Sequence, residues 1–228
     1  MKEVRGRNQT EVTEFLLLGL SDNPDLQAVL FALFLLIYMA NMVGNLGMIV
    51  LIKIDLCLHT PMYFFLSVLS FIDSSFSTVD TPRLLESFLI SSQSISFAGC
   101  MVQMALMILH GTAECLLLAI MAYDRYTAVC QPLLYVTIIT EKARWGLVTG
   151  AYVAGFFSAF VRTVTAFTLS FCGNNEINFI FRDLPPLLKL SCGDSYTQEV
   201  VIIVFALFVM PACILVILVS YLFIIVAI

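Results

Sequence analysis

Five long stretches of this chain carry almost no charge, and this feature constrains the fold most. They cover residues 26–52, 62–81, 87–123, 145–161 and 200–228, with interruptions at Asp73, Asp80, His110 and Glu114. A helix needs about 20 residues to cross roughly 30 Å of hydrocarbon. Lipid offers backbone N–H and C=O groups no partners, so each stretch must satisfy its own as a helix. The sequence therefore predicts an all-α membrane protein with transmembrane helices at about residues 26–53, 61–83, 95–127, 143–164 and 197–228.

Composition supports a lipid bilayer as the surroundings of this chain. Hydrophobic residues make up 61% of the 228 residues and charged residues only 12%. A soluble domain of this size could not cover so much apolar surface. The net charge of −5 argues against nucleic acid as a partner.

The chain divides into an N-terminal segment, residues 1–25, and a membrane region, residues 26–228, which includes a long loop at residues 165–196. The N-terminal segment is charged, and its apolar run is too short for a cleaved signal peptide. Counting basic residues does not fix the orientation. The triplet Asn8-Gln9-Thr10 is a glycosylation acceptor, which is usable only outside the cytosol. Cys172 and Cys192 in the long loop also suit an oxidising compartment, so the N-terminus is expected outside.

The third stretch ends in a pair of opposite charges, Asp124 and Arg125. Such a pair costs little where a helix meets water and much more a few residues deeper. Paired with its neighbour, Arg125 stays near the helix, whereas an unpaired Arg125 can contact a protein that docks from the cytosol. A switch at a helix end is one interpretation, and an interfacial Arg that anchors the helix is the other.

The sequence around this pair, MAYDRYTAVC at residues 121–130, closely resembles the end of the third helix in odorant receptors, a branch of the rhodopsin-like G-protein-coupled receptors. Further segments resemble the same family in the same order. They are NQTEVTEFLLLGL at residues 8–20, Gly44-Asn45, LHTPMYFFL at residues 58–66, residues 69–73, residues 171–192 and Ser220-Tyr221. The resemblance implies a rhodopsin-like helical bundle, with five of the usual seven helices in this sequence.

The resemblance also implies a function, namely binding of small volatile or lipophilic odorants within the bundle and coupling to a stimulatory G protein. The coupling switch would consist of Asp124, Arg125, Tyr126 and Tyr221. Two mostly apolar helical stripes correspond to the odorant-lining positions of the family: Met107, Ile108, Gly111 and Thr112 on one helix, and Phe205, Ala206 and Val209 on another. Ordinary helix packing is the alternative for any one of these residues.

Two carboxyl groups, Asp73 and Glu114, lie in the middle of predicted membrane helices, where a charge is expensive. Glu114 precedes Arg125 by about three helical turns, or roughly 16 Å, on the same face. Asn45, Asp73 and Glu114 are therefore predicted to form a polar cluster that holds sodium or another cation, since oxygen ligands suit such ions. Protonated carboxyls hydrogen-bonded to their neighbours are the alternative. No other cofactor is expected, and no catalytic motif is present.

The cysteines depart from the family pattern. Family members usually pair a cysteine of the long outer loop with the start of the third helix, where this chain has Cys100. The matching loop position is Arg182. Cys172 and Cys192 resemble a second pair that the family uses, so they are predicted to form the disulfide and to leave Cys100 unpaired.

The resemblance leaves two expectations about the fate of the chain. An odorant receptor functions in the plasma membrane as a multi-pass protein. Because the sequence lacks the sixth and seventh helices, the alternative is a truncated product that does not signal. Such a product would remain in the endoplasmic reticulum or pair with other receptors.

Overall fold

Five long helices dominate the computed structural model, which describes residues 14–18, 24–90, 92–167, 176–177 and 196–227. The long helices are α1 (Pro24–Ile54), α2 (Pro61–Leu89), α3 (Phe97–Cys130), α5 (Glu141–Phe167) and α7 (Tyr196–Ala227). Each contains a segment that is long and apolar enough to cross a membrane. A 3-10 turn, η1 (Leu56–Leu58), joins α1 to α2, and a short helix, α4 (Pro132–Ile138), joins α3 to α5.

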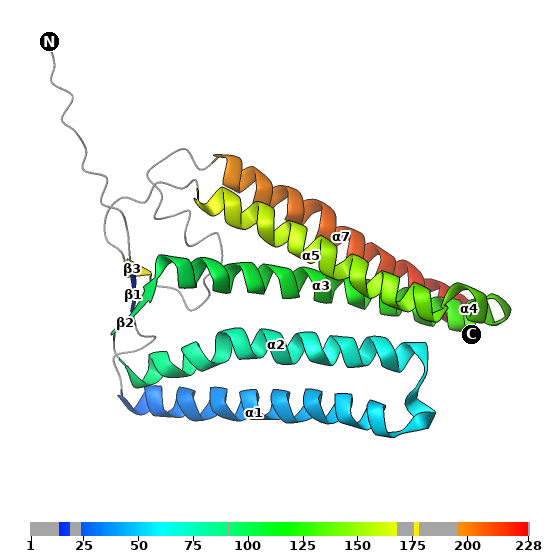
Figure 1. Cartoon of the computed structure of the whole chain (residues 1–228), viewed down its shortest axis with the longest axis horizontal. Helices are drawn as coiled ribbons and strands as arrows, with labels where there is room; N and C mark the ends of the chain where they lie inside the picture. The colour runs from blue at the N-terminus through cyan, green and yellow to red at the C-terminus, as the bar shows by residue number, and fades with distance from the viewer. Residues whose placement is uncertain (1–13, 19–23, 91, 168–175, 178–195, 228) are drawn as a thin grey trace, which may run out of the picture.

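The helix α3 runs through the middle of the bundle (Figure 1). It packs against α2 on one side, with α1 beyond α2, and against α5 and α7 on the other side. The loop helix α4 lies at the end of the bundle where α3 finishes. We call this the Arg125 end, and we expect it to face the cytosol.

A small three-stranded sheet lies at the opposite end, which we call the sheet end (Figure 1). It consists of β1 (Glu14–Leu18), β2 (Ser92–Ser96) and β3 (Glu176–Ile177), in the order β2-β1-β3. β1 is antiparallel to β2 and parallel to β3. The sheet and α4 are short elements between the long apolar stretches, and the sequence did not predict them.

Local sequence explains where several helices begin. Asp55 accepts a hydrogen bond from the backbone N–H of Cys57 at 2.9 Å, which starts the turn η1. Pro61 occupies the first turn of α2, where its missing N–H costs nothing. Ser96 caps α3 by accepting a hydrogen bond from the Gly99 N–H at 3.2 Å.

The helix α2 is longer than the sequence predicted. The charge on Arg83 ends the apolar stretch, but the helix continues to Leu89 with Pro82 inside it. The length of an apolar stretch indicates how much of a helix lies in the hydrocarbon of the bilayer. The helix itself can continue into the headgroup region and the water. The other helix ends lie close to the predicted positions. Arg83, the last residue of the predicted helix, therefore lies inside α2 and lines a hollow together with residues of α3.

A buried core joins α2, α3 and α5. Its members are apolar side chains that face each other across the three helices: Phe65, Ile72, Ala113, Leu117 and Val148. The outward faces of α1 and α7 are exposed and apolar, with Leu36 68% exposed and Val226 76% exposed. Such faces suit lipid and not water, since monomeric soluble proteins rarely expose large apolar patches.

Candidate functional site

Asp124 and Arg125 face different neighbours at the Arg125 end. Asp124 is only 2% exposed. Its Oδ1 atom accepts a hydrogen bond from the hydroxyl of Tyr135 on α4 at 3.1 Å. Thr127, also buried, donates to the backbone carbonyl of Asp124 at 2.9 Å. The carboxyl of Asp124 is thus turned toward the loop helix and helps to fix it against α3.

The hydroxyl of Tyr135 remains a donor over the whole physiological range. Burial, followed by the neighbouring charge and hydrogen bond of Asp124, raises the pKa of Tyr135 to about 12. A raised folded-state pKa favours the neutral phenol in the fold. The stability that this bond contributes is therefore complete below about pH 10, the ordinary tyrosine value. It is lost as the pH rises through about 12.

Replacing Tyr135 by Phe should destabilise the Arg125 end. The change leaves the buried Asp124 without its side-chain hydrogen bond, and an unsatisfied buried acceptor costs about 1–3 kcal/mol. Thermal unfolding of the purified chain in detergent or nanodiscs measures the effect. Tyr123→Phe is the matched control, because Tyr123 is next to Asp124 on α3, is 41% exposed and, in the described part of the chain, makes no hydrogen bond to Asp124 through its hydroxyl. Equal stability of the two variants would contradict a supporting role for the Tyr135 hydroxyl.

Arg125 points toward α7. Its Nη1 atom donates to the hydroxyl of Tyr221 at 3.2 Å. Tyr126 also contacts α7, with its ring centroid 5.7 Å from that of Phe223. Of the four predicted switch residues, the structure thus brings Arg125 and Tyr126 of α3 against α7, which carries Tyr221. The fourth, Asp124, is hydrogen-bonded to α4 instead. Arg125 itself stays exposed, so its guanidinium is accessible from the Arg125 end.

A second set of contacts holds α5 at the same end. The ring of Phe64 on α2 lies 4.9 Å from that of Trp145 in an edge-to-face arrangement. The guanidinium of Arg144 lies over the Phe64 ring at 5.4 Å, a cation–π distance. The sequence interpretation gave none of these three residues a role. Arg144 carries positive charge toward Asp124 as well.

The predicted polar cluster is only partly assembled. Asp73 on α2 and Glu114 on α3 are close enough to interact electrostatically. Asn45 instead donates to both the backbone and side-chain oxygens of Asn41 at 3.1 Å. Asn41 in turn accepts a hydrogen bond from Ser77 at 3.3 Å, which ties α1 to α2. Asn45 therefore serves the α1–α2 interface, and the two carboxyls form a pair of their own.

The predicted odorant stripes belong to α3 and α7, two helices that pack against each other. Ile108 is buried, while Met107, Gly111 and Thr112 are half-buried. Gly111 has open space around it, since a Cβ atom there would meet nothing within 4 Å. Val209 on α7 is half-buried. The adjacent Met210 contacts Cys115 of α3, with their sulfur atoms 3.5 Å apart.

Several predicted positions lie outside the described residues. They are Asn8, Cys172, Cys192 and the side chains of Phe205 and Ala206. Cys100 is described and is completely buried near the start of α3. The predicted disulfide and glycosylation site remain predictions.

The geometry defines a membrane-embedded helical bundle with an accessible Arg at one end, and comparison places its fold among the rhodopsin-like receptors. Squid rhodopsin superposes with a TM-score of 0.69 at 17% sequence identity. The match covers 90% of this chain and 53% of the rhodopsin chain, so it shows a shared fold.

Sequence comparison identifies the family. The family model described as olfactory receptor matches residues 34–228. Human olfactory receptor 9Q2 is 71% identical over 222 residues, which cover 97% of this chain and 71% of that protein. Human olfactory receptor 5AP2 is 58% identical over 228 residues, which cover 100% of this chain and 72% of that protein. The chain belongs to the olfactory receptor family, whose members are multi-pass membrane receptors and not enzymes.

Proposed function

We propose that this chain binds small volatile or lipophilic odorants between α3 and α7 and couples to a stimulatory G protein at the Arg125 end. The observation that carries the proposal is the position of Arg125. Its guanidinium is exposed and held by one hydrogen bond to Tyr221, while the neighbouring Asp124 is engaged with α4. An Arg held this loosely at a helix end can exchange its partner for a group on a docking protein.

The odorant site is supported by the half-buried stripes on α3 and α7. The open space at Gly111 and the mostly apolar residues around it suit a small lipophilic molecule. Thr112 adds one hydroxyl group to this lining. Pockets of this kind discriminate ligands by shape more than by polar contacts.

A cation between Asp73 and Glu114 belongs to the same proposal. Within the described residues, neither carboxyl has a hydrogen-bond partner, and the two interact with each other. Two like charges in a membrane are costly unless an ion or protons compensate them. Sodium suits carboxylate oxygens, whereas protonation of one or both carboxyls is the alternative.

We place the active receptor in the plasma membrane with its N-terminus outside. The test expresses residues 1–228 joined to the segment of olfactory receptor 9Q2 that follows its matched region, with a surface tag and a cyclic-AMP reporter. A dose-dependent response to an odorant panel is expected. A fused receptor that reaches the surface and gives no more signal than its own Arg125→Ala variant would contradict the proposal.

The second candidate function is a chain that does not signal and is retained in the endoplasmic reticulum or pairs with other receptors. The outward faces of α1 and α7 are not covered by other helices of the described structure, so a helix of another receptor can reach them in the membrane. Expression of residues 1–228 alone tests it in the same cells. Retention inside the cell, with no odorant response, is the result that this candidate predicts.

A further inference from the structure

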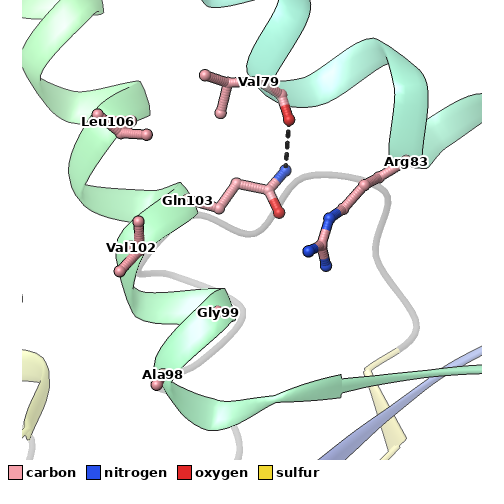
Figure 2. Close-up of a pocket in the computed structure, with 7 residues that line it drawn as sticks. All are labelled: Val79, Arg83, Ala98, Gly99, Val102, Gln103 and Leu106. Carbon is pink, nitrogen blue, oxygen red and sulfur yellow. Dashed lines mark hydrogen bonds between the residues drawn. The ribbon is translucent and has the colours of Figure 1, made fainter.

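A cavity of about 430 Å³ lies between α2 and α3 at the sheet end (Figure 2). It is on the α2 side of α3, whereas the proposed odorant site lies between α3 and α7. Its walls are largely apolar and include Val79, Val102 and Leu106. Two polar side chains, those of Arg83 and Gln103, extend into the same space.

Gln103 is fixed in place by α2. Its Nε2 atom donates to Oδ1 of Asp80 at 2.8 Å and lies 3.5 Å from the carbonyl oxygen of Val79. These contacts hold the amide across the gap between the two helices, and Figure 2 shows its oxygen on the side of Arg83. They also occupy one oxygen of Asp80, which lies three residues before Arg83 on α2, as Glu86 lies three residues after it.

Arg83 is the cation of the cavity. It projects from the part of α2 that continues beyond Pro82. Within the described part of the chain, its guanidinium has no hydrogen bond or ion pair. A guanidinium has five N–H donors in a fixed fork that matches a carboxylate with two parallel hydrogen bonds. Here that fork is exposed and borders an open, largely apolar hollow, so one molecule can meet both the charge and the apolar wall.

We propose that this cavity binds a small aliphatic monocarboxylate, with its carboxylate on Arg83 and its hydrocarbon chain along α3. The apolar wall from Val102 to Leu106 spans one helical turn, about 6 Å. A short chain therefore fits, whereas a long fatty acid would extend beyond the wall. The first turn of α3 forms the floor at Gly99, and its helix dipole also favours negative charge.

The site is independent of the odorant site and of G-protein coupling, so direct binding tests it. Pentanoate is titrated into the purified chain in nanodiscs and detected by saturation-transfer NMR, with empty nanodiscs as the blank. Pentan-1-ol and pentanamide, which keep the chain and lose the charge, are the comparison ligands. We expect pentanoate to bind at least about 10-fold more tightly than either, since hydrogen bonds to charged groups are the stronger kind.

Two variants test the two halves of the site. Arg83→Gln should weaken pentanoate binding by about 10-fold or more, and Arg83→Lys should restore part of it, because Lys keeps the charge without the fork. Val102→Trp should block binding by filling the cavity. It should still fold, because Val102 is 61% exposed. Lys142→Gln, an exposed basic residue at the other end of the bundle, is the charge control.

The outcomes decide the proposal without reference to signalling. Weaker binding in Arg83→Gln and Val102→Trp, with the Lys142→Gln control unchanged, supports it. Equal binding of pentanoate and pentan-1-ol, or unchanged pentanoate binding in a folded Arg83→Gln variant, overturns it. Failure of pentanoate to bind the unmodified chain at millimolar concentration also overturns it, and each result leaves the odorant proposal untouched.

Discussion

Replacing Arg125 by Ala should abolish G-protein activation while leaving insertion and surface delivery intact. Arg125 is exposed and makes a single side-chain hydrogen bond, to Tyr221, in the described structure. A typical hydrogen bond contributes only about 0.5–1.5 kcal/mol net. Its loss leaves no buried charge behind, so the fold should tolerate the change. The docking surface, in contrast, loses the one cation that α3 presents at this end.

The measurement is the cyclic-AMP response of the fused receptor described above, normalised to its surface level. Lys142→Ala is the matched control, because Lys142 is another exposed cation at the Arg125 end. Tyr221→Phe separates the two roles of Arg125, since it removes the hydroxyl acceptor and keeps the guanidinium. We expect loss of signal in Arg125→Ala and retention in Lys142→Ala. Full signalling by Arg125→Ala would remove Arg125 from the proposed mechanism.

The sequence predicted the long helices because the membrane leaves so few alternatives. An uncharged stretch such as residues 26–52 must cross the bilayer, and only a helix satisfies its backbone there. The end of α2 was harder to predict, since hydrophobicity stops at Arg83 while the helix continues to Leu89. The small sheet pairs residues from three distant parts of the chain, and no local pattern reports such pairing.

The proposed switch residues were predicted from a motif, but their hydrogen-bond partners required the structure. Tyr221 was named from the family resemblance, and it accepts the hydrogen bond of Arg125. Tyr135 was not named, although it is the hydrogen-bond partner of Asp124. It lies in α4, a short helix without the long apolar run that identified the others. The signal available in the sequence was a hydroxyl-bearing residue, Tyr135, in the loop that follows Asp124.

The cavity between α2 and α3 shows the same limit at the other end of the bundle. Arg83 and Gln103 are far apart in sequence, and each is unremarkable alone. They meet because α2 continues past Pro82 and because α3 packs beside it. Conversely, Asn45 was grouped with Asp73 and Glu114 from the sequence, yet its amide binds Asn41 one turn away. Helical periodicity predicts a face, whereas the partner on that face depends on how the neighbouring helix is rotated.

Gly155→Val should give the largest loss of stability. Gly155 is on α5, at a point where the backbone of α3 comes very close. A Cβ atom at Gly155 would lie 2.7 Å from the backbone carbonyl oxygen of Leu109, and 3.6 Å from the backbone N of Ala113. A backbone oxygen cannot rotate away as a flexible side chain can. The helices must therefore separate, which also disturbs Ala113 in the buried core. Small residues at membrane helix interfaces permit this kind of approach.

The expected magnitude follows from two opposing effects. Overpacking typically costs about 1–3 kcal/mol, and Val adds more atoms to the clash than Ala does. Replacing Gly by Ala in a helix returns up to about 1 kcal/mol through helix propensity. Gly150 is the matched control on the same helix, because a Cβ atom there would meet nothing within 4 Å. Gly150→Ala should thus be neutral or stabilising, Gly155→Ala destabilising and Gly155→Val more so, as measured by thermal unfolding of the purified chain. If Gly155→Ala unfolds at the same temperature as Gly150→Ala, α3 and α5 do not pack as closely as the structure places them.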